Sequence, residues 1–308
     1  MKAKPYQGIA SFLKSPIGDL SRDIGVYGIP FDTATSFRPG ARFGPNAIRQ
    51  ASMMLTDGEH PLFWTDPQAR VTDMGDIPVS SDPVQCVADI AATLADSPFI
   101  QPGKRIMTMG GDHLVTLGIL RALHVVHGPI AVIHFDSHSD CWSDGFDQPI
   151  GHGTWLRNAV EEGLVSPRHS TSIGVRSPTD KETANWFGSK GGGTISARNA
   201  MKRGVNNLAE RIISRTWDLP TYISFDIDAL DPAYAPGTGT PEVGGFTTMF
   251  ALEVVEKLVG WNMMLPPECS EKSNLIGMDV VEVSPPYDHS DITALAAATL
   301  MWTFASSR

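Results

Sequence analysis

Residues 130–140 read IAVIHFDSHSD, a mostly apolar run that ends in a string of polar side chains. The run is rich in β-branched residues and too short for a helix, so it is typical of a buried strand. Strands that are apolar on both faces belong to parallel sheets covered by helices on either side. The stretch therefore predicts a central strand of an α/β sheet with chemistry at its carboxyl end.

The same alternation of apolar run, polar turn and amphipathic segment recurs along the chain and predicts βαβ units. We expect a three-layer α/β/α sandwich with a mostly parallel central sheet. No linker or internal repeat divides residues 1–308, so one domain is expected, with 1–20 as an N-terminal extension. Gly191–Gly193 is interpreted as a loop and 261–274 as an irregular connection. The expected strands are 24–29, 105–109, 130–135, 171–175, 221–227 and 275–283. The expected helices are 45–54, 83–94, 114–127, 153–163, 206–216, 248–258 and 291–303.

Composition narrows the class of protein. A formal charge of −10 argues against general nucleic-acid binding, which needs clustered Lys and Arg at phosphates. The three cysteines, Cys86, Cys141 and Cys269, are odd in number and far apart, which favours a reducing compartment and hence the cytoplasm. We find no signal peptide and no apolar segment long enough to cross a membrane, so neither membrane nor nucleic acid is an expected partner.

Polar side chains that suit metal ions follow three of the expected strands. Asp136, His138 and Asp140 alternate after the expected strand 130–135, and extended backbone would point the three side chains to one side. Asp226 and Asp228 follow another strand, and His113 ends the segment MGGDH. Taken alone, His113 is more simply a structural residue, and either aspartate of the DxD pair a cap. Loops at the carboxyl ends of neighbouring parallel strands converge, so the three segments are expected to meet.

Four carboxylates brought together in a buried place would repel one another and lose hydration unless cations neutralised them. Two divalent ions carry the matching charge of +4. Oxygen donors with two imidazoles suit Mn²⁺ best, with Ni²⁺, Co²⁺ and Zn²⁺ as alternatives. The sequence therefore predicts a binuclear metal centre.

Seven motifs spread over most of the chain resemble the arginase and agmatinase family of ureohydrolases. They are SFRPGARFGP (36–45), GGDH (110–113), DSHSD (136–140), HGT (152–154), SFDIDALDP (224–232), APGTGTP (235–241) and EVSP (282–285). The resemblance implies an arginase/deacetylase-like fold and two shared ligands, Asp136 and Asp226. It assigns His113 and Asp140 to one ion and His138 and Asp228 to the other. Ser137 stands where the family more often has Ala, and we expect its hydroxyl to act from behind the ligands.

The resemblance also implies a reaction. His152 corresponds to the family's proton-shuttling histidine and Glu282 to the carboxylate facing the guanidinium. A metal-bridging hydroxide would attack the guanidinium carbon, Asp140 would pass a proton to the leaving amine, and urea would be released. The simpler alternatives are that His152 caps a helix and Glu282 forms an ion pair.

The substrate tail is less determined. Arginases bind the amino acid end of arginine partly through a Ser-Gly-Asn segment just before the shuttle histidine. Residues 147–152 (DQPIGH) lack that triplet. The resemblance therefore favours the agmatinase-like branch of the family. Loops 31–37, 141–151 and 176–187 are expected near the tail. The candidate tail-binding residues are Trp142, Asp144, Phe146 and Arg176, with Asp147 and Arg38 as further possibilities.

Two other functions stay open on the sequence alone. One is a single-zinc, deacetylase-type amide hydrolase, which has no use for six ligands. The other is a non-catalytic subunit that supports an active paralogue in a mixed oligomer. Family members form trimers or hexamers, so the resemblance implies a homo-oligomer.

Overall fold

The computed structural model describes residues 4–56, 58–144, 147–216, 219–263 and 275–307. Its core is one eight-stranded sheet in the order β2-β1-β3-β8-β7-β4-β5-β6, in which every neighbouring pair is parallel. The strands are β1 Ile24–Gly28, β2 Val71–Asp76, β3 Arg105–Met109, β4 Ala131–Phe135, β5 Thr171–Val175, β6 Gly193–Ser196, β7 Thr221–Asp226 and β8 Leu275–Val281. The expected α/β fold with a parallel sheet is confirmed.

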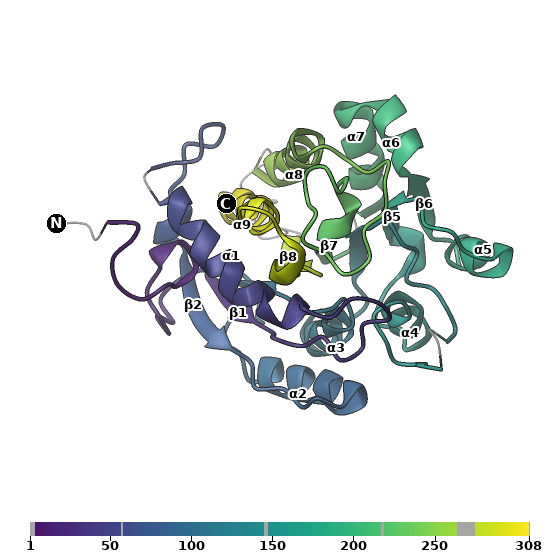
Figure 1. Cartoon of the computed structure of the whole chain (residues 1–308), viewed down its shortest axis with the longest axis horizontal. Helices are drawn as coiled ribbons and strands as arrows, with labels where there is room; N and C mark the ends of the chain where they lie inside the picture. Colours follow the sequence, from purple (N-terminus) through teal and green to yellow (C-terminus); the bar gives the residue numbers. More distant parts are fainter. Residues whose placement is uncertain (1–3, 57, 145–146, 217–218, 264–274, 308) are drawn as a thin grey trace.

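Helices cover both faces of the sheet, as Figure 1 shows with α2, α3 and α4 on one side and α7, α8 and α9 on the other. Each face has its own apolar cluster, so the molecule has three layers. The helices are α1 Gly44–Ser52, α2 Pro83–Ala95, α3 Val115–His127, α4 Trp155–Glu161, α5 Lys181–Ser189, α6 Ala197–Arg203, α7 Val205–Thr216, α8 Thr248–Met263 and α9 Ile292–Ala305. In the described part of the chain, no helix is long and apolar enough to span a membrane.

The two edge strands of the sheet, β2 and β6, were not predicted from the sequence. β2 (VTDMGD) carries two aspartates and a glycine, and β6 (GTIS) has only four residues. Neither contains the apolar run that marked the six interior strands, because an edge strand is less completely buried. Gly193, interpreted as part of a loop, is the first residue of β6.

Two short helices were also missed, and one was predicted too short. α5 occupies most of the expected loop 176–187 and begins where the Asp180 carboxylate accepts from the backbone N–H and hydroxyl of Thr183, at 2.9 and 2.7 Å. α6 follows an N-cap at Ser196. α8 continues through 261–263, so the expected irregular connection is wrong for those residues, and 264–274 lies outside the described residues.

The N-terminal segment and β2 are tied to α1 by a buried ion pair. Arg49 donates through Nε and Nη2 to the Asp73 carboxylate at 2.8 and 3.0 Å, and through Nη1 to Asp76 at 2.6 Å. The Asp73 carboxylate also accepts from the backbone N–H of Phe12, which is fully buried in the core. Arg49 therefore joins three segments that are distant in sequence.

Arg49→Met is expected to lower the free energy of unfolding by about 3–5 kcal/mol, because it strands the buried Asp73 carboxylate without its cation. The measurement is chemical denaturation followed by circular dichroism. Arg121→Met is the control, since Arg121 also makes a two-pronged pair with Glu162, but both side chains are one-third exposed. Arg121→Met should therefore lower the free energy of unfolding by less than about 1 kcal/mol. Equal losses in the two variants would show that the Arg49 pair gains nothing from burial.

Candidate metal centre and active site

The chemistry-bearing residues meet at the carboxyl ends of four adjacent strands, β3, β8, β7 and β4. His113 follows β3, Glu282 follows β8, Asp226 ends β7 and Asp136 follows β4. Because parallel strands end on the same edge of a sheet, residues 169 positions apart come within hydrogen-bond distance, as His113 and Glu282 do. The sheet order thus brings the three predicted segments together.

One group of donors converges on His113. Its Nδ1 lies 3.1 Å from Asp136 Oδ2, 3.1 Å from Asp140 Oδ2 and 3.2 Å from Asp226 Oδ2. This nitrogen is buried and has no hydrogen-bond partner within the described ranges. A buried polar atom in this state costs free energy unless something else satisfies it. One nitrogen and three carboxylate oxygens around a common point are a suitable ligand set for a divalent cation.

A second group converges on His138 and shares Asp136 with the first. His138 Nδ1 lies 3.0 Å from Asp228 Oδ2 and 3.3 Å from Asp136 Oδ1. Asp136 therefore directs one oxygen to each histidine. A carboxylate in this position can bridge two ions, and the structure thus brings all six predicted ligand residues into two adjoining groups.

The backbone that achieves this is not the extended one expected from the sequence. Residues 137 and 138 form a bend after β4, and Asp140 has a positive φ of 49°. Asp226 is followed by a short 3-10 turn, Ile227–Ala229, whose Asp228 N–H donates to Asp226 Oδ1 at 2.8 Å. Alternation along a strand was therefore the wrong reason for a correct grouping, since turns aim these side chains.

The charges of the cluster's own side chains are unbalanced. Burial and the charges of Asp228 and Asp136 raise the pKa of Asp226 well above its ordinary value. Burial and Asp136 likewise raise the pKa of Asp228. Burial alone would raise the pKa of Asp136 too, but the surrounding histidines, His134 foremost, hold it well below the ordinary value. Carboxylates crowded in this way are relieved by cations, so the residues present fit two divalent ions.

Glu282 and His152 lie beside the first group. Glu282 Oε1 accepts from the His113 backbone N–H at 3.0 Å and from His152 Nδ1 at 2.8 Å. Burial lowers the pKa of His152, but the hydrogen bond and charge of Glu282 outweigh it and raise that pKa to about 9. Glu282 Oε2 is buried and has no hydrogen-bond partner within the described ranges. One carboxylate oxygen is therefore free to meet a cationic group of a substrate.

Strain accompanies this arrangement. Glu282 has a φ of 62°, in the left-handed region that residues other than glycine seldom adopt. Asp140 shares that feature, and such conformations cost about 1–3 kcal/mol each and gather at functional sites. The surrounding structure holds both residues there, which aims their carboxylates at the cluster.

Ser137 contacts two of the predicted ligand residues, and its hydroxyl lies at the His138 nitrogen that faces Asp136 and Asp228. Its backbone N–H donates to Asp228 Oδ1 at 2.9 Å, and its hydroxyl lies 3.0 Å from His138 Nδ1. Its carbonyl accepts from the N–H groups of Arg176 and Ser177. Ser137 thus joins a ligand from β4 to a ligand from β7.

Two residues that the sequence analysis did not select lie against the cluster. His134 Nε2 is 2.8 Å from Asp136 Oδ2, and Trp155 Nε1 donates to Asp140 Oδ2 at 2.6 Å. The Trp155 ring stacks on His113 with centroids 4.7 Å apart. A signal for His134 was available, since it precedes Asp136 by two residues on one strand and shares its face. No such signal marked Trp155.

The candidate tail-binding residues fall into different environments. Trp142 lies near the centre, with its ring centroid 6.4 Å from that of His138, and Asp144 is exposed. Phe146 lies outside the described residues. Arg176 donates to several backbone carbonyls, including those of Asp228 and Glu242 at 2.8 and 2.6 Å. These bonds engage its guanidinium in holding the turn that carries Asp228.

Asp147 and Arg38, the two further candidates for binding the substrate tail, also lie in different environments. Asp147 is exposed and has a positive φ of 62°. Arg38 donates to the carbonyls of Thr238 and Gly239, and its guanidinium lies over the Tyr287 ring at 4.4 Å. Arg38 is therefore engaged with neighbouring backbone, as Arg176 is.

Comparison with known proteins agrees with this geometry. The family model described as "Arginase family" matches residues 22–306. An agmatinase of Proteus mirabilis is 41% identical over 297 residues, which cover 94% of this chain and 90% of the relative. The crystal structure of a hypothetical agmatinase from Burkholderia thailandensis has 37% identity and a TM-score of 0.85, covering 98% of this chain and 91% of its own. Proclavaminate amidino hydrolase from Streptomyces clavuligerus has 33% identity and a TM-score of 0.86, covering 99% and 100%.

Proposed function

The chain belongs to the arginase family, and on that premise we propose that its four aspartates and two histidines hold two divalent ions and that it releases urea from a guanidino compound. The observation that carries this proposal is the convergence of three carboxylate oxygens on the unpartnered His113 Nδ1. We assign His113, Asp136, Asp140 and Asp226 to one ion, and His138, Asp136, Asp226 and Asp228 to the other. Asp136 and Asp226 are then the bridging residues.

When bound, two divalent ions lower the pKa of a shared water and supply the nucleophile that a resonance-stabilised guanidinium otherwise resists. Glu282 orients the substrate, because its free Oε2 offers a buried negative charge to the guanidinium N–H groups. Asp140 Oδ2 lies 3.1 Å from His113 Nδ1, at the point where the donors converge, so Asp140 would accept the proton of the attacking water oxygen and pass it to the leaving amine.

His152 connects this site to its surroundings. Its Nδ1 bonds Glu282, while its Nε2 lies 3.1 Å from the backbone N and 2.8 Å from the hydroxyl of Ser36, an exposed residue. A ring placed between a buried carboxylate and a surface hydroxyl is suited to exchange protons with solvent. We therefore assign the proton-shuttling role to His152.

We propose Mn²⁺ for both metal positions because oxygen donors with two imidazoles suit it best, with Ni²⁺ as the alternative. We place the enzyme in the agmatinase-like branch, since relatives named agmatinase are about 40% identical and the segment 147–152 lacks the Ser-Gly-Asn triplet. Agmatine and guanidino acids are the leading substrate classes. Trp142 and Asp144 are the tail-binding candidates that the described structure leaves available, and Phe146 is retained from the sequence.

We also propose that the enzyme works in the cytoplasm as a homo-oligomer. Cys86 and Cys141 are free and buried, which suits a reducing compartment such as the cytoplasm. A trimer or hexamer is proposed from family resemblance, and light scattering after gel filtration measures it. We treat residues 1–308 as one functional domain.

A urea-release screen tests the function. Protein loaded with Mn²⁺ or with Ni²⁺ is incubated with agmatine, guanidinobutyrate, guanidinopropionate, arginine, guanidine and a biguanide. We expect urea from at least one non-arginine substrate, with two ions per chain by elemental analysis. No urea from any compound would contradict the proposal, while one zinc per chain with amide hydrolysis would favour the deacetylase-type alternative. Urea release by the purified chain alone excludes a merely supporting subunit.

A further inference from the structure

The proposed function leaves His134 without a role, although it lies directly behind the carboxylate assigned to both ions. Its Nε2 is 2.8 Å from Asp136 Oδ2, and its side chain is 1% exposed. We propose that His134 is a positioning residue that fixes the Asp136 carboxylate so that its remaining lone pairs face the two ions. This inference rests on the proposed binuclear centre and adds a residue that supports it.

The His134 ring is fixed by its neighbours on the sheet. β4 and β5 pair with His134 opposite Ser172, so the Ser172 hydroxyl lies 3.0 Å from His134 Nδ1. The ring of Trp155 meets the imidazole edge-on, with centroids 5.3 Å apart and an interplanar angle of 89°. A ring bonded at both nitrogens and packed against an indole has one orientation available. Its direction toward Asp136 is therefore set by the sheet register.

His134 has a hydrogen-bond partner at each ring nitrogen. Nε2 donates to the Asp136 carboxylate, and Nδ1 lies against the Ser172 hydroxyl, which can either donate or accept. The hydrogen bond from Nε2 occupies one lone pair of Asp136 and leaves the others for the two ions.

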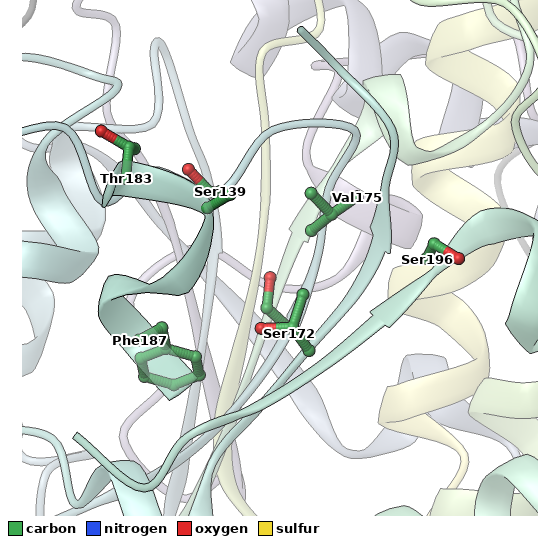
Figure 2. Close-up of a pocket in the computed structure, with 8 residues that line it drawn as sticks. Ser139, Ser172, Val175, Thr183, Phe187 and Ser196 are labelled. Carbon is green, nitrogen blue, oxygen red and sulfur yellow. The ribbon is translucent and has the colours of Figure 1, made fainter. Parts of the chain in front are cut away.

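Ser172 also faces a cavity of about 160 Å³ beneath α5. Figure 2 shows Ser172 and Ser139 on its wall with Val175, Thr183, Phe187 and Ser196. Ser139 lies between the ligand residues His138 and Asp140, and its hydroxyl is buried without a hydrogen-bond partner in the described part of the chain. The cavity wall is mostly apolar but includes several residues with hydroxyl groups, so a cavity of this size can hold a water molecule beside Ser172.

The test separates the hydrogen bond from the packing of the ring. His134→Leu removes the donor, whereas His134→Gln places an amide N–H near the former Nε2 and restores it. Ser172→Ala leaves the ring but removes its hydrogen-bond partner at Nδ1. His60→Leu is the matched control, because His60 is also 1% exposed but packs between Phe63 and Trp302. Mn²⁺ affinity is measured on the full-length proteins by competition with a chelator.

We expect His134→Leu to bind both ions about 10–100-fold more weakly, the usual effect of losing a group that orients a ligand. His134→Gln should recover most of the lost Mn²⁺ affinity. The affinity of Ser172→Ala should lie between those of His134→Leu and the unsubstituted protein, and His60→Leu should match the unsubstituted protein. The proposal is overturned if His134→Leu binds Mn²⁺ as tightly as His60→Leu does. It is also overturned if His134→Gln binds as weakly as His134→Leu, since packing alone would then explain the loss.

Failure of the underlying function gives a different result. If the unsubstituted chain binds fewer than two ions, the proposed centre itself is wrong. If it binds two and His134→Leu binds two with equal affinity, only the role of His134 is wrong. Should His134→Leu fail to fold, His134→Gln and Ser172→Ala still decide the matter, because both keep a side chain of similar volume.

Discussion

Asp228→Asn is expected to leave the protein with one divalent ion per chain and to reduce kcat for urea release about a thousandfold. The ion that Asp228 helps to hold contributes several kcal/mol to transition-state stabilisation, and about 4 kcal/mol corresponds to that factor. The asparagine oxygen can still accept from the Ser137 N–H that bonds Asp228 Oδ1, so local structure is retained. Elemental analysis and a urea assay measure the two effects together.

His138→Ala should behave in the same way, since both residues belong to the second group. Asp231→Asn is the control: it removes one carboxylate three residues further along, whose oxygens accept from the backbone N–H groups of Ala233 and Gly244. It should keep two ions and near-normal activity. Full metal content and full activity in Asp228→Asn would refute the ligand assignment.

Glu282→Gln is expected to lower kcat/KM by roughly a thousandfold while both ions remain bound. Removing one member of a buried, hydrogen-bonded charge pair costs about 2–5 kcal/mol, and about 4 kcal/mol, within that range, corresponds to this factor. Glutamine keeps the size of the side chain and an oxygen for the His113 N–H. What it loses is the negative charge offered by Oε2, so the deficit belongs to guanidinium binding and orientation.

The comparison variants for Glu282 separate charge from geometry. Glu282→Asp keeps the charge on a shorter side chain and should retain more activity than Glu282→Gln. Glu242→Gln removes an acidic group whose Oε1 accepts from the Ser177 hydroxyl, and it should leave kcat/KM unchanged. Loss of metal from Glu282→Gln would argue that the residue supports the ions instead of the substrate.

The interior of the sheet could be predicted because burial on both faces leaves a distinct sequence pattern. Residues 130–135 and 221–225 are nearly continuous apolar runs, and both became interior strands. The edge strands β2 and β6 carry little of that pattern, since solvent or loops lie on one side of them. α5 was missed for another reason. Its start is marked by the capping contact of Asp180 with Thr183, which is only a weak signal in the sequence.

The sequence predicted which residues gather in the cluster from their chemistry, but it did not predict the backbone that brings them together. Extended alternation was assumed for residues 136–140, but a bend and a positive φ at Asp140 aim the side chains. Trp155 and Ser172 could not be found from sequence spacing, because their contacts with Asp140 and His134 arise only when strands and helices pack. Nor could sequence spacing show that the Arg176 guanidinium donates to the backbone carbonyls of Asp228 and Glu242, so its role at the substrate tail stays a prediction.

The place of β8 in the sheet also governs the order in which the molecule can be assembled. β8 is the last of the eight strands in the sequence, yet it lies between β3 and β7 and joins the half of the sheet that carries His113 to the half that carries the other ligands. During synthesis, β3 and β7 are therefore open edges until residues 275–281 emerge, and open edges invite wrong pairing. The long sequence separation between β3 and β8 adds a slow, late closure step. Without β8, the half of the sheet that carries His113 is not held beside the half that carries Asp136, Asp140 and Asp226, so the first group of donors comes together only once β8 is in place.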